Sequence, residues 1–356
     1  MEKYSQFRDK GTAIAPFLPV PTPPTSPIWA PVHALLFLIR APAVFFLSTF
    51  YFLILEWVPV GQFVRKCVLW LILAIPGVWW VDLQVDGVKR GKLGSKLDYL
   101  PHPGTIIASS FTSPLDPLYL AGIFHPIFTR AYPSTRKVER ITLFSAILLA
   151  FAPPRLAPKS PSSKSLTTLK ELQARNPNAI ICVFPECTTT NGRGILPFSP
   201  ALLTADPKTK IYPVSLRYTP GDITTPVPGN MAGWIWKLLS KPTHALRVRV
   251  ARHVYNNDSL ETPYAIGEKK GATARGTGYE ENIFESPHLR DGFGVKDEDS
   301  DADGEDTEEE DEVTQKERKV LDRVGEDLAR LGRVKRVDLG VETKIEFVKV
   351  WGSRKR

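Results

Sequence analysis

Two polar loops of the sequence carry residue types that can do chemistry. One lies in "VFPECTTTNGRGILPF", Val183 to Phe198, where an apolar run gives way to Glu186, three threonines and Arg193 between two glycines. The other is "SSFTSPLD", which ends at Asp116. Glycines let the backbone approach a ligand closely, and arginine side chains and backbone N–H groups bind phosphate oxygens. The two loops therefore predict a site for a polar, anionic ligand.

The charge distribution also favours an anionic partner. The chain of 356 residues has a net charge of +8, although the run Asp297–Glu312 alone holds 12 acidic residues. The remainder is strongly basic, which is typical of proteins that meet nucleic acid, membrane phosphates or a phosphorylated ligand. No RNA- or DNA-binding module is recognisable, so we expect no nucleic-acid partner. The three cysteines and six histidines form no metal-binding pattern, which predicts no metal site and a reducing, cytosolic environment.

Apolar runs predict the elements that position the two loops. Short runs at 104–109 and 179–184 are typical of buried strands, and each runs directly into one of the loops. Strands alternate with helices along the chain, which predicts an α/β fold with a mixed, largely parallel sheet flanked by helices. Ligands of such sheets bind beyond the carboxyl ends of the strands, so the loops face each other if their strands are neighbours. Further strands are predicted at 81–85, 126–132, 210–218, 246–254 and 343–351, and helices at 141–152, 166–175, 233–241 and 313–334.

The N-terminal part is predicted to enter a membrane. Leu35–Leu55 is a nearly continuous apolar run of 21 residues, long enough as a helix to cross a hydrocarbon core, and Arg40 interrupts it. Cys67–Val81 is shorter and ends in a tryptophan pair that suits the headgroup layer. We expect a helical hairpin that dips into the membrane and returns, with Arg40 snorkelling to the interface and both flanks on the cytosolic side. The alternative is two buried helices of a soluble protein.

The motif blocks resemble those of the glycerophospholipid acyltransferase family. "FPECTTTNGRG" is similar to the "FPEGT" block of that family, and "FTSPLD" stands where its "HxxxxD" block is expected. "IYPVSL", which contains Pro213, resembles the fourth block, and Arg130 resembles the basic residue of the second. With the C-terminal "LGRVKRVDLG" and "KIEFVKVW", the chain is most similar to the fungal lysophosphatidic acid:oleoyl-CoA acyltransferase branch.

This resemblance implies a fold similar to that of the glycerol-3-phosphate acyltransferases and a reaction. A fatty acyl group, oleoyl in that branch, passes from acyl-CoA to lysophosphatidic acid or a related lysophospholipid, giving phosphatidic acid and CoA with no cofactor beyond the acyl-CoA co-substrate. The implied catalytic residues are Asp116 and Glu186. The implied substrate-binding residues are Arg130, Thr188, Thr189, Thr190, Asn191, Gly192, Arg193 and Pro213.

The chain departs from the family pattern at the residue expected to be the base. The catalytic histidine of the family falls at Phe111, which cannot take a proton from the attacking hydroxyl. His102 and His125 are candidate substitutes, although neither occupies the family position. An alternative hypothesis is therefore a catalytically impaired relative that binds phospholipids or acts as a scaffold at the membrane. The family glycine after the glutamate is Cys187 here, and its arginine is Thr189.

These features divide the chain into five predicted parts. The N-terminus is disordered and proline-rich, the membrane hairpin and the acyltransferase-like α/β domain follow, and a polar, acidic, disordered insertion precedes a C-terminal helix and strand that pack back on the domain. The expected boundaries are 1–27, 28–82, 83–255, 256–312 and 313–356. A hairpin anchor suits the endoplasmic reticulum membrane and the monolayer of a lipid droplet, with the catalytic domain facing the cytosol.

Overall fold

The computed structural model describes residues 2–58, 61–89, 97–158, 166–257 and 314–353. These residues belong to one compact unit, which comprises 1–258 and 313–356. The predicted acidic insertion lies almost wholly outside the described residues.

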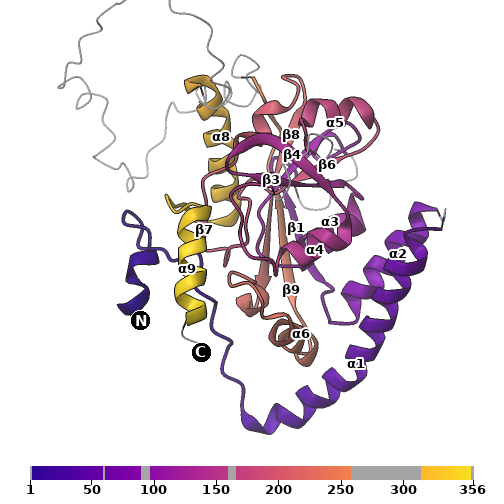
Figure 1. The fold of residues 1–356 in the computed structure, drawn as a ribbon. Coiled ribbons are helices and arrows are strands. Elements are labelled where there is room, and N and C mark those ends of the chain that lie inside the picture. The colour runs from indigo at the N-terminus through magenta and orange to yellow at the C-terminus, as the bar shows by residue number, and fades with distance from the viewer. Residues whose placement is uncertain (1, 59–60, 90–96, 159–165, 258–313, 354–356) are drawn as a thin grey trace, which may run out of the picture. The chain divides into compact units, whose positions relative to one another are not determined.

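The domain is built on one nine-stranded mixed sheet (Figure 1). Its strands are β1 (Trp80–Val85), β2 (Ile106–Ser109), β3 (Ile127–Tyr132), β4 (Thr135–Ile141), β5 (Leu166–Thr167), β6 (Ile181–Val183), β8 (Lys210–Thr219), β9 (Ala245–Val250) and β10 (Val254–Tyr255). The order is β1-β9-β8-β2-β6-β3-β4-β5, with β10 paired to β8. The four central strands, β8, β2, β6 and β3, are parallel, whereas β9, β4 and β5 add antiparallel pairs. The prediction of a mixed, largely parallel sheet flanked by helices is confirmed.

Helices cover both faces of this sheet. They are α1 (Ala30–Phe50), α2 (Gln62–Ala74), α3 (Leu115–Ile123), α4 (Leu143–Leu149), α5 (Leu169–Arg175), α6 (Met231–Ser240), α8 (Gln315–Gly332) and α9 (Val341–Ser353). Single turns lie at Glu2–Phe7, Pro27–Trp29, Tyr51–Leu55, Leu97–Tyr99, Pro200–Thr204 and Gly221–Ile223. Ile107 of β2 faces a core shared with α2, α3, α4 and α6, whereas its neighbours Ile106 and Ala108 face a second core shared with α5 and α8. Burial on both faces explains why the central strands read as continuous apolar runs.

The strand pairing brings the two predicted loops together. β2 and β6 are direct neighbours in parallel register, with Ile107 opposite Cys182 and Ala108 opposite Val183. Both strands therefore end at the same edge of the sheet, and the polar segments that follow them start side by side. The backbone N–H of Thr190 donates to the carbonyl of Phe111 at 3.0 Å, which joins the two loops directly.

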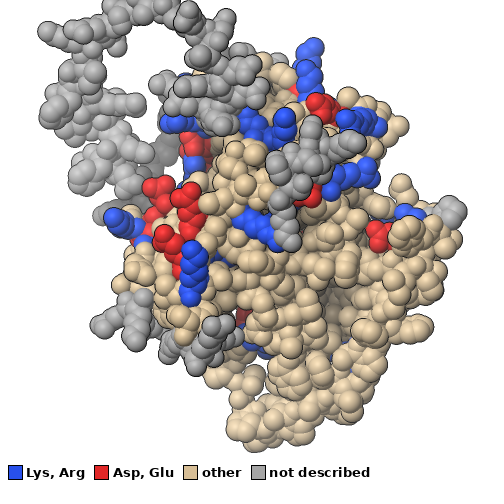
Figure 2. Space-filling model, in the orientation of Figure 1, with Lys and Arg blue, Asp and Glu red and all other residues tan. Residues whose placement is uncertain are grey.

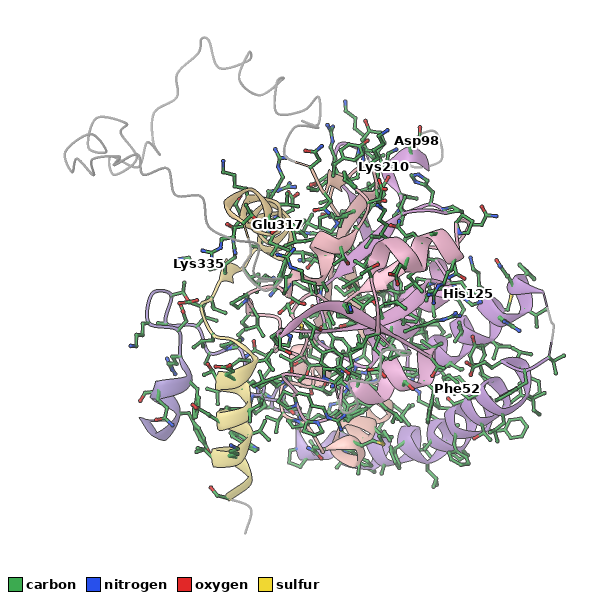
Figure 3. The ribbon with its side chains drawn as sticks, turned by 45° about the horizontal axis from the view of Figure 1, so that its top comes forward. Phe52, Asp98, His125, Lys210, Glu317 and Lys335 are labelled. Carbon is green, nitrogen blue, oxygen red and sulfur yellow. The ribbon has the colours of Figure 1, made fainter. Side chains whose placement is uncertain are left out.

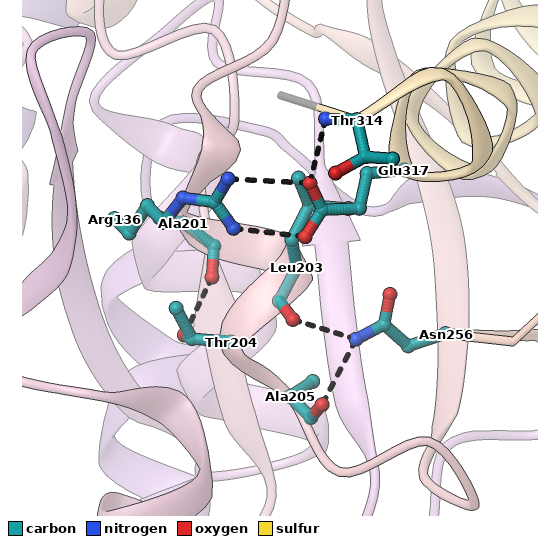
Figure 4. Close-up of polar contacts among 8 residues, drawn as sticks. All are labelled: Arg136, Ala201, Leu203, Thr204, Ala205, Asn256, Thr314 and Glu317. Atoms are coloured by element: carbon teal, nitrogen blue, oxygen red, sulfur yellow. Dashed lines mark hydrogen bonds and ion pairs between the residues drawn. The ribbon is translucent and has the colours of Figure 1, made fainter. Parts of the chain in front are cut away.

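α8 returns the chain to the domain after the acidic region. Thr314 caps the helix in a capping box with Glu317, whose carboxylate accepts the Thr314 N–H at 2.9 Å. The same carboxylate receives two guanidinium hydrogen bonds from Arg136 on β4, at 2.8 and 3.2 Å (Figure 4). A bidentate pair of this kind fixes orientation as well as position. The start of α8 is thus tied to the sheet, and its C-terminal end lies over β8 and β9, where Arg249 donates to the Leu331 carbonyl at 2.9 Å.

The prediction of a C-terminal strand is wrong. Residues 341–353 form helix α9, because the apolar residues that pack, Phe347, Val348 and Trp351, follow helical spacing rather than alternation. Two residues between α8 and α9, β11 (Lys335–Arg336), instead pair in parallel with β7 (Gly194–Ile195). The C-terminal segment therefore extends the loop that contains Glu186 and Arg193.

The described part of the N-terminal segment is not disordered, contrary to the prediction from its proline content. Tyr4, Phe7 and Phe17 are buried against Leu196 and Phe347. The Asn191 side chain donates to the Ala15 and Leu18 carbonyls, both at 2.8 Å. The prediction failed because these scattered aromatic residues show no periodicity, and the surface that they cover is formed only when α9 is in place.

α1 is long and apolar enough to cross a membrane, when the turn at Tyr51–Leu55 is included with it. Only a small share of the helix is buried, and side chains such as Leu38, Phe45 and Phe46 are mostly exposed. α2 behaves differently, because it packs Leu69 and Leu73 into the domain core beside α3. Figure 2 shows an uncharged surface over α1 and α6, with charged side chains gathered elsewhere on this face.

Arg40 does not snorkel in this structure. Its guanidinium donates to the carbonyls of Lys241 and Pro242, at 2.5 and 3.0 Å, just after the end of α6. Carbonyls at a helix C-terminus carry partial negative charge, so a cation there is stabilised. Phe37 adds a ring contact to Trp236 of α6, with centroids 4.9 Å apart. α1 is therefore fixed along one side of the domain, beside α6.

Candidate active site

Asp116 lies in the first turn of α3, completely buried and fully hydrogen-bonded. One carboxylate oxygen accepts the Thr112 and Ser113 N–H groups at 2.6 and 3.0 Å, and the Thr112 hydroxyl at 3.2 Å. The other oxygen accepts the Tyr218 hydroxyl at 2.5 Å. Burial raises the pKa of Asp116 to about 6, and the hydrogen bonds from Tyr218 and the loop oppose that shift. Among the described residues the hydrogen-bond donors to Asp116 are amides and hydroxyls, with no imidazole.

Phe111 fills the position at which the related motif has its histidine. Its ring is buried and stacks on Phe184 with centroids 4.4 Å apart, and Phe184 in turn stacks on Phe128. The side chain is thus part of the apolar core rather than of a polar site. His102 and His125 do not replace the missing base. His102 precedes β2 at the opposite end from the loop, and His125 follows α3 at the far end from Asp116, roughly 13 Å along a helix of that length.

Glu186 is the buried acid of the second loop. One of its oxygens accepts the Leu196 N–H at 3.4 Å, and the other has no hydrogen-bond partner among the described residues. Burial raises the pKa of Glu186 to about 8, whereas the Leu196 N–H, the ammonium of Lys344 and the backbone N–H of Phe111 lower it, and the nearby Asp116 raises it. A buried carboxyl group with a free oxygen and a pKa near neutral has the properties of a general acid or base.

The two loops line one small cavity. Thr112 and Ser110 come from the loop after β2, and Glu186 and Thr190 come from the loop after β6. The cavity measures about 10 Å³, enough for about one water molecule, and is largely enclosed by its lining residues. Asp116 does not line this cavity, but its carboxylate accepts hydrogen bonds from the backbone N–H and the hydroxyl of Thr112. This arrangement can receive a single hydroxyl or carbonyl oxygen next to the free oxygen of Glu186.

Thr188 and Thr189 of the second loop bind a lysine, Lys344, that was not predicted as a site residue. The ammonium of Lys344, on α9, donates to the Thr188 hydroxyl at 2.8 Å and to the Thr189 carbonyl and hydroxyl at 2.5 and 3.0 Å. Thr189 also donates to the Thr225 carbonyl at 2.6 Å. Burial lowers the pKa of Lys344 to about 7, and Glu186 opposes that shift. Thr188 and Thr189 therefore hold Lys344 in place. Of the substrate-binding residues predicted in this loop, Thr190 and Gly192 line the narrow cavity.

Arg193 lies on a second, wider cavity of about 590 Å³. Arg217 of β8 and Val334 line both cavities, so the wide one adjoins the narrow one. Besides Arg193 and Arg217, the wide cavity is lined by Arg333 and Lys335 of the C-terminal segment and by Thr12, Ile14 and Val334. Arg193 is exposed, and its own backbone N–H donates to the side-chain oxygen of Asn191 at 3.0 Å. The cavity thus presents cations from three separate parts of the chain.

Like Thr188, Thr189 and Asn191, the predicted binding residues Arg130 and Pro213 line neither cavity. Arg130 is half-buried on β3, with its guanidinium over the Tyr132 ring at 4.9 Å, and its Nε atom has no hydrogen-bond partner among the described residues. Pro213 sits inside β8, opposite Ala108 of β2, where its carbonyl accepts the Ala251 N–H. Their predicted contacts with a substrate stay predictions.

The residues that sequence reasoning missed come from outside the motif blocks. Tyr218 follows Arg217 near the carboxyl end of a predicted strand. This position was the only feature of the sequence that indicated a place at the site. Arg333 and Lys335 belong to the basic run "GRVKR", which could have been recognised as a candidate anion site. Lys344 carries no local signal, because burial of a lysine depends on how α9 docks.

The chain resembles known acyltransferases. The family model described as Acyltransferase matches residues 95–217, which include both loops. A putative lysophosphatidic acid:oleoyl-CoA acyltransferase of Schizosaccharomyces pombe is 28% identical over 265 residues, covering 70% of this chain and 83% of that protein. Lysophosphatidic acid:oleoyl-CoA acyltransferase 1 of Saccharomyces cerevisiae is 28% identical over 202 residues, or 56% of this chain and 61% of that protein. No solved structure matches the chain.

Proposed function

Because the chain belongs to the glycerophospholipid acyltransferase family, in its fungal branch, we propose that it acylates lysophosphatidic acid at a membrane. An oleoyl group would pass from oleoyl-CoA to the free glycerol hydroxyl, giving phosphatidic acid and CoA. The names of the two fungal relatives support both substrates. The basic character of the domain supports binding of their phosphates.

One observation carries the proposal: Thr112 and Glu186, one from each motif loop, line the same enclosed cavity. A hydroxyl that enters this cavity from the acceptor lipid meets the Glu186 carboxyl group, one oxygen of which forms no hydrogen bond of ordinary geometry among the described residues. The loop hydroxyls of Ser110 and Thr112 lie on the other wall of the same space. Proximity of this kind supplies much of the barrier reduction in acyl transfer.

In this proposal Glu186 acts as the general base, the role of the histidine in the family motif. Its ionised carboxylate accepts the proton of the glycerol hydroxyl as the oxygen attacks the thioester carbonyl carbon. The new carbon–oxygen bond forms, the carbon–sulfur bond breaks with its electron pair on sulfur, and the thiolate leaves with the proton that Glu186 held. The carboxylate is regenerated, and no cofactor enters. Asp116 acts as a positioning residue, because it holds Thr112 and Tyr218 without reaching the cavity.

The membrane part of the proposal is supported by α1 and the uncharged surface beside it. Exposed apolar side chains continue from α1 to Phe144 of α4 and Trp236 of α6. An apolar surface shared by several elements suits a protein that lies on and partly within a lipid layer. We expect the endoplasmic reticulum membrane or a lipid-droplet monolayer, with the catalytic domain in the cytosol.

The direct test uses the full chain in phosphatidylcholine vesicles. Supplied with labelled oleoyl-CoA and lysophosphatidic acid, it is expected to form labelled phosphatidic acid, with less product when lysophosphatidylcholine replaces the acceptor. Vesicles prepared without the protein are the control. Product no greater than in that control, across several lysophospholipid acceptors, contradicts the proposal and leaves the non-catalytic lipid-binding alternative.

The pH dependence of the reaction should report Glu186. Because burial raises the pKa of Glu186 to about 8, this carboxyl group is mostly protonated below that pH and cannot accept a proton. The rate of acyl transfer is therefore expected to rise with pH and to level off above about 8. The pKa of Asp116 is about 6, so at lower pH this carboxylate is protonated as well and loses part of its capacity to accept hydrogen bonds. The rate should then fall further. A rate that levels off near 6.5, the ordinary pKa of histidine, argues for a different base.

A further inference from the structure

The wide cavity holds more positive charge than its surroundings neutralise. Arg193, Arg217, Arg333 and Lys335 line it, and its lining includes no carboxylate. None of these four side chains forms an ion pair with a carboxylate among the residues that the structure describes. By contrast, the neighbouring Arg336 pairs with Asp322 at 2.6 Å. Cations gathered without counterions repel one another, which favours an anionic ligand in the space between them.

Two further arginines lie nearby on β9, and one of them, Arg247, pairs with Asp82 at 3.5 Å. Arg217 lies opposite Arg247 in the pairing of β8 with β9, and Arg249 lies two residues further along β9. Burial lowers the pKa of Arg249, and the charges of Arg333 and Arg247 lower it further. Burial likewise lowers the pKa of Arg217, with a contribution from Arg247. The wide cavity is therefore part of a larger region that is rich in arginine.

The backbone around the cavity holds these cations in position. Arg217 donates to the Gly332 carbonyl at 2.5 Å, which ties β8 to the end of α8. Arg333 ends α8 in the left-handed conformation, with φ of 49°. Lys335 pairs with Gly194 through β11 and β7, which places it beside the loop of Arg193. The motif loop thus contributes Arg193 to the site, and the C-terminal segment contributes Arg333 and Lys335.

The location of the cavity favours a water-soluble ligand. Lys335 lies on the opposite side of the domain from Phe52, which marks the apolar surface next to α1 (Figure 3). In Figure 1 the same separation appears between α8 with β7 and α1 with α2. The wide cavity is largely open to solvent, and its volume of about 590 Å³ is large enough for a cofactor-sized ligand. Its inner end, at Arg217 and Val334, adjoins the narrow cavity that contains Glu186.

We propose that the wide cavity binds the phosphate groups of the CoA part of the acyl donor, with its pantetheine arm directed past Arg217 and Val334 toward Glu186. CoA carries a phosphomonoester and a diphosphate, which matches a cluster of guanidinium and ammonium groups. The thioester carbonyl then lies beside the narrow cavity, which receives the acceptor hydroxyl. This inference rests on the proposed function for the identity of the donor, but it predicts CoA binding with or without turnover.

The test measures binding of CoA to the full chain in detergent micelles by calorimetry. The double variant Arg333→Gly/Lys335→Ala removes two cations, and glycine suits the left-handed backbone at position 333. We expect the dissociation constant for CoA to rise on the order of tenfold or more for each cation removed. Wild-type affinity should fall when CoA is replaced by 3′-dephospho-CoA, and this difference should shrink in the variant. The matched control is Arg336→Ala, which lies in the same segment outside the cavity and should bind CoA as the wild type does.

The outcomes separate this inference from the proposed function. If the double variant binds CoA as tightly as the wild type, the inference is overturned, whatever the activity. If it instead loses binding of glycerol 3-phosphate, the headgroup of the acceptor, while CoA binding is kept, the cavity belongs to the acceptor phosphate and the inference is equally overturned. If CoA binds and the variant weakens it, but no phosphatidic acid forms, the inference holds and the proposed function fails. In an active enzyme, the variant should raise the KM for oleoyl-CoA and leave the KM for lysophosphatidic acid unchanged.

Discussion

Replacing Glu186 by glutamine is expected to lower acyl transfer on the order of 100- to 10,000-fold, the usual contribution of a positioned acid or base. Glutamine has nearly the same shape and can still accept the Leu196 N–H that Glu186 accepts. It cannot take a proton from the acceptor hydroxyl. The loss should appear in kcat, measured as release of free CoA thiol, with little change in thermal stability, because the carboxyl group that is replaced is mostly neutral at pH 7.

Cys187→Gly is the matched control for this variant. Cys187 is the next residue and has φ of 58°, which glycine adopts without strain. Burial raises the pKa of the Cys187 thiol to about 12, so the sulfur is a poor nucleophile and an acyl-cysteine intermediate is not expected. Retained activity in Cys187→Gly together with loss in Glu186→Gln assigns the effect to the carboxyl group. Equal activity in wild type and Glu186→Gln removes Glu186 from the mechanism.

Replacing Asp116 by asparagine is expected to lower kcat about 100-fold and to destabilise the domain by about 2 to 4 kcal/mol. The carboxylate accepts four hydrogen bonds from Thr112, Ser113 and Tyr218, whereas the amide nitrogen of asparagine accepts none. Either Tyr218 or the Thr112 loop then loses its partner inside the core. Thr112 lines the narrow cavity, so its displacement disturbs the acceptor hydroxyl directly.

Tyr218→Phe separates positioning from stability. It removes one of the four hydrogen bonds to Asp116 but leaves Thr112 and Ser113 bound. We expect a clear loss of thermal stability with a much smaller loss of kcat than in Asp116→Asn, both assayed well below the melting temperature. If the two variants lose activity in proportion to their melting temperatures, Asp116 contributes only to stability.

The sequence was sufficient to predict the central sheet and the meeting of the two loops. Buried parallel strands are continuous apolar runs, and the polar residues that follow β2 and β6 mark their carboxyl ends. Arg193 was predicted to bind an anion because of its glycine neighbours; the structure places it on a cavity lined by other cations, and its contact with a ligand stays a prediction.

The residues that complete the site could not be predicted, because they depend on distant contacts. Lys344 reaches Thr188 and Thr189 only because α9 packs on the N-terminal aromatic residues. Alternating apolar residues in that segment suggested a strand, and tertiary packing made it a helix. Arg40 suggested a snorkelling charge, whereas the end of α6 provides its carbonyl partners. Each of these contacts joins parts of the chain about 100 or more residues apart, and local patterns carry no information about such partners.

The role of Glu186 as the base is tested by comparing three proteins in the same vesicles with labelled oleoyl-CoA and lysophosphatidic acid. These are the wild type, Glu186→Gln and Phe111→His, which restores the histidine of the family at the cost of the buried stack on Phe184. We expect the wild type to form labelled phosphatidic acid and Glu186→Gln to form almost none. Turnover by Phe111→His alone, with the wild type inactive, contradicts this role of Glu186.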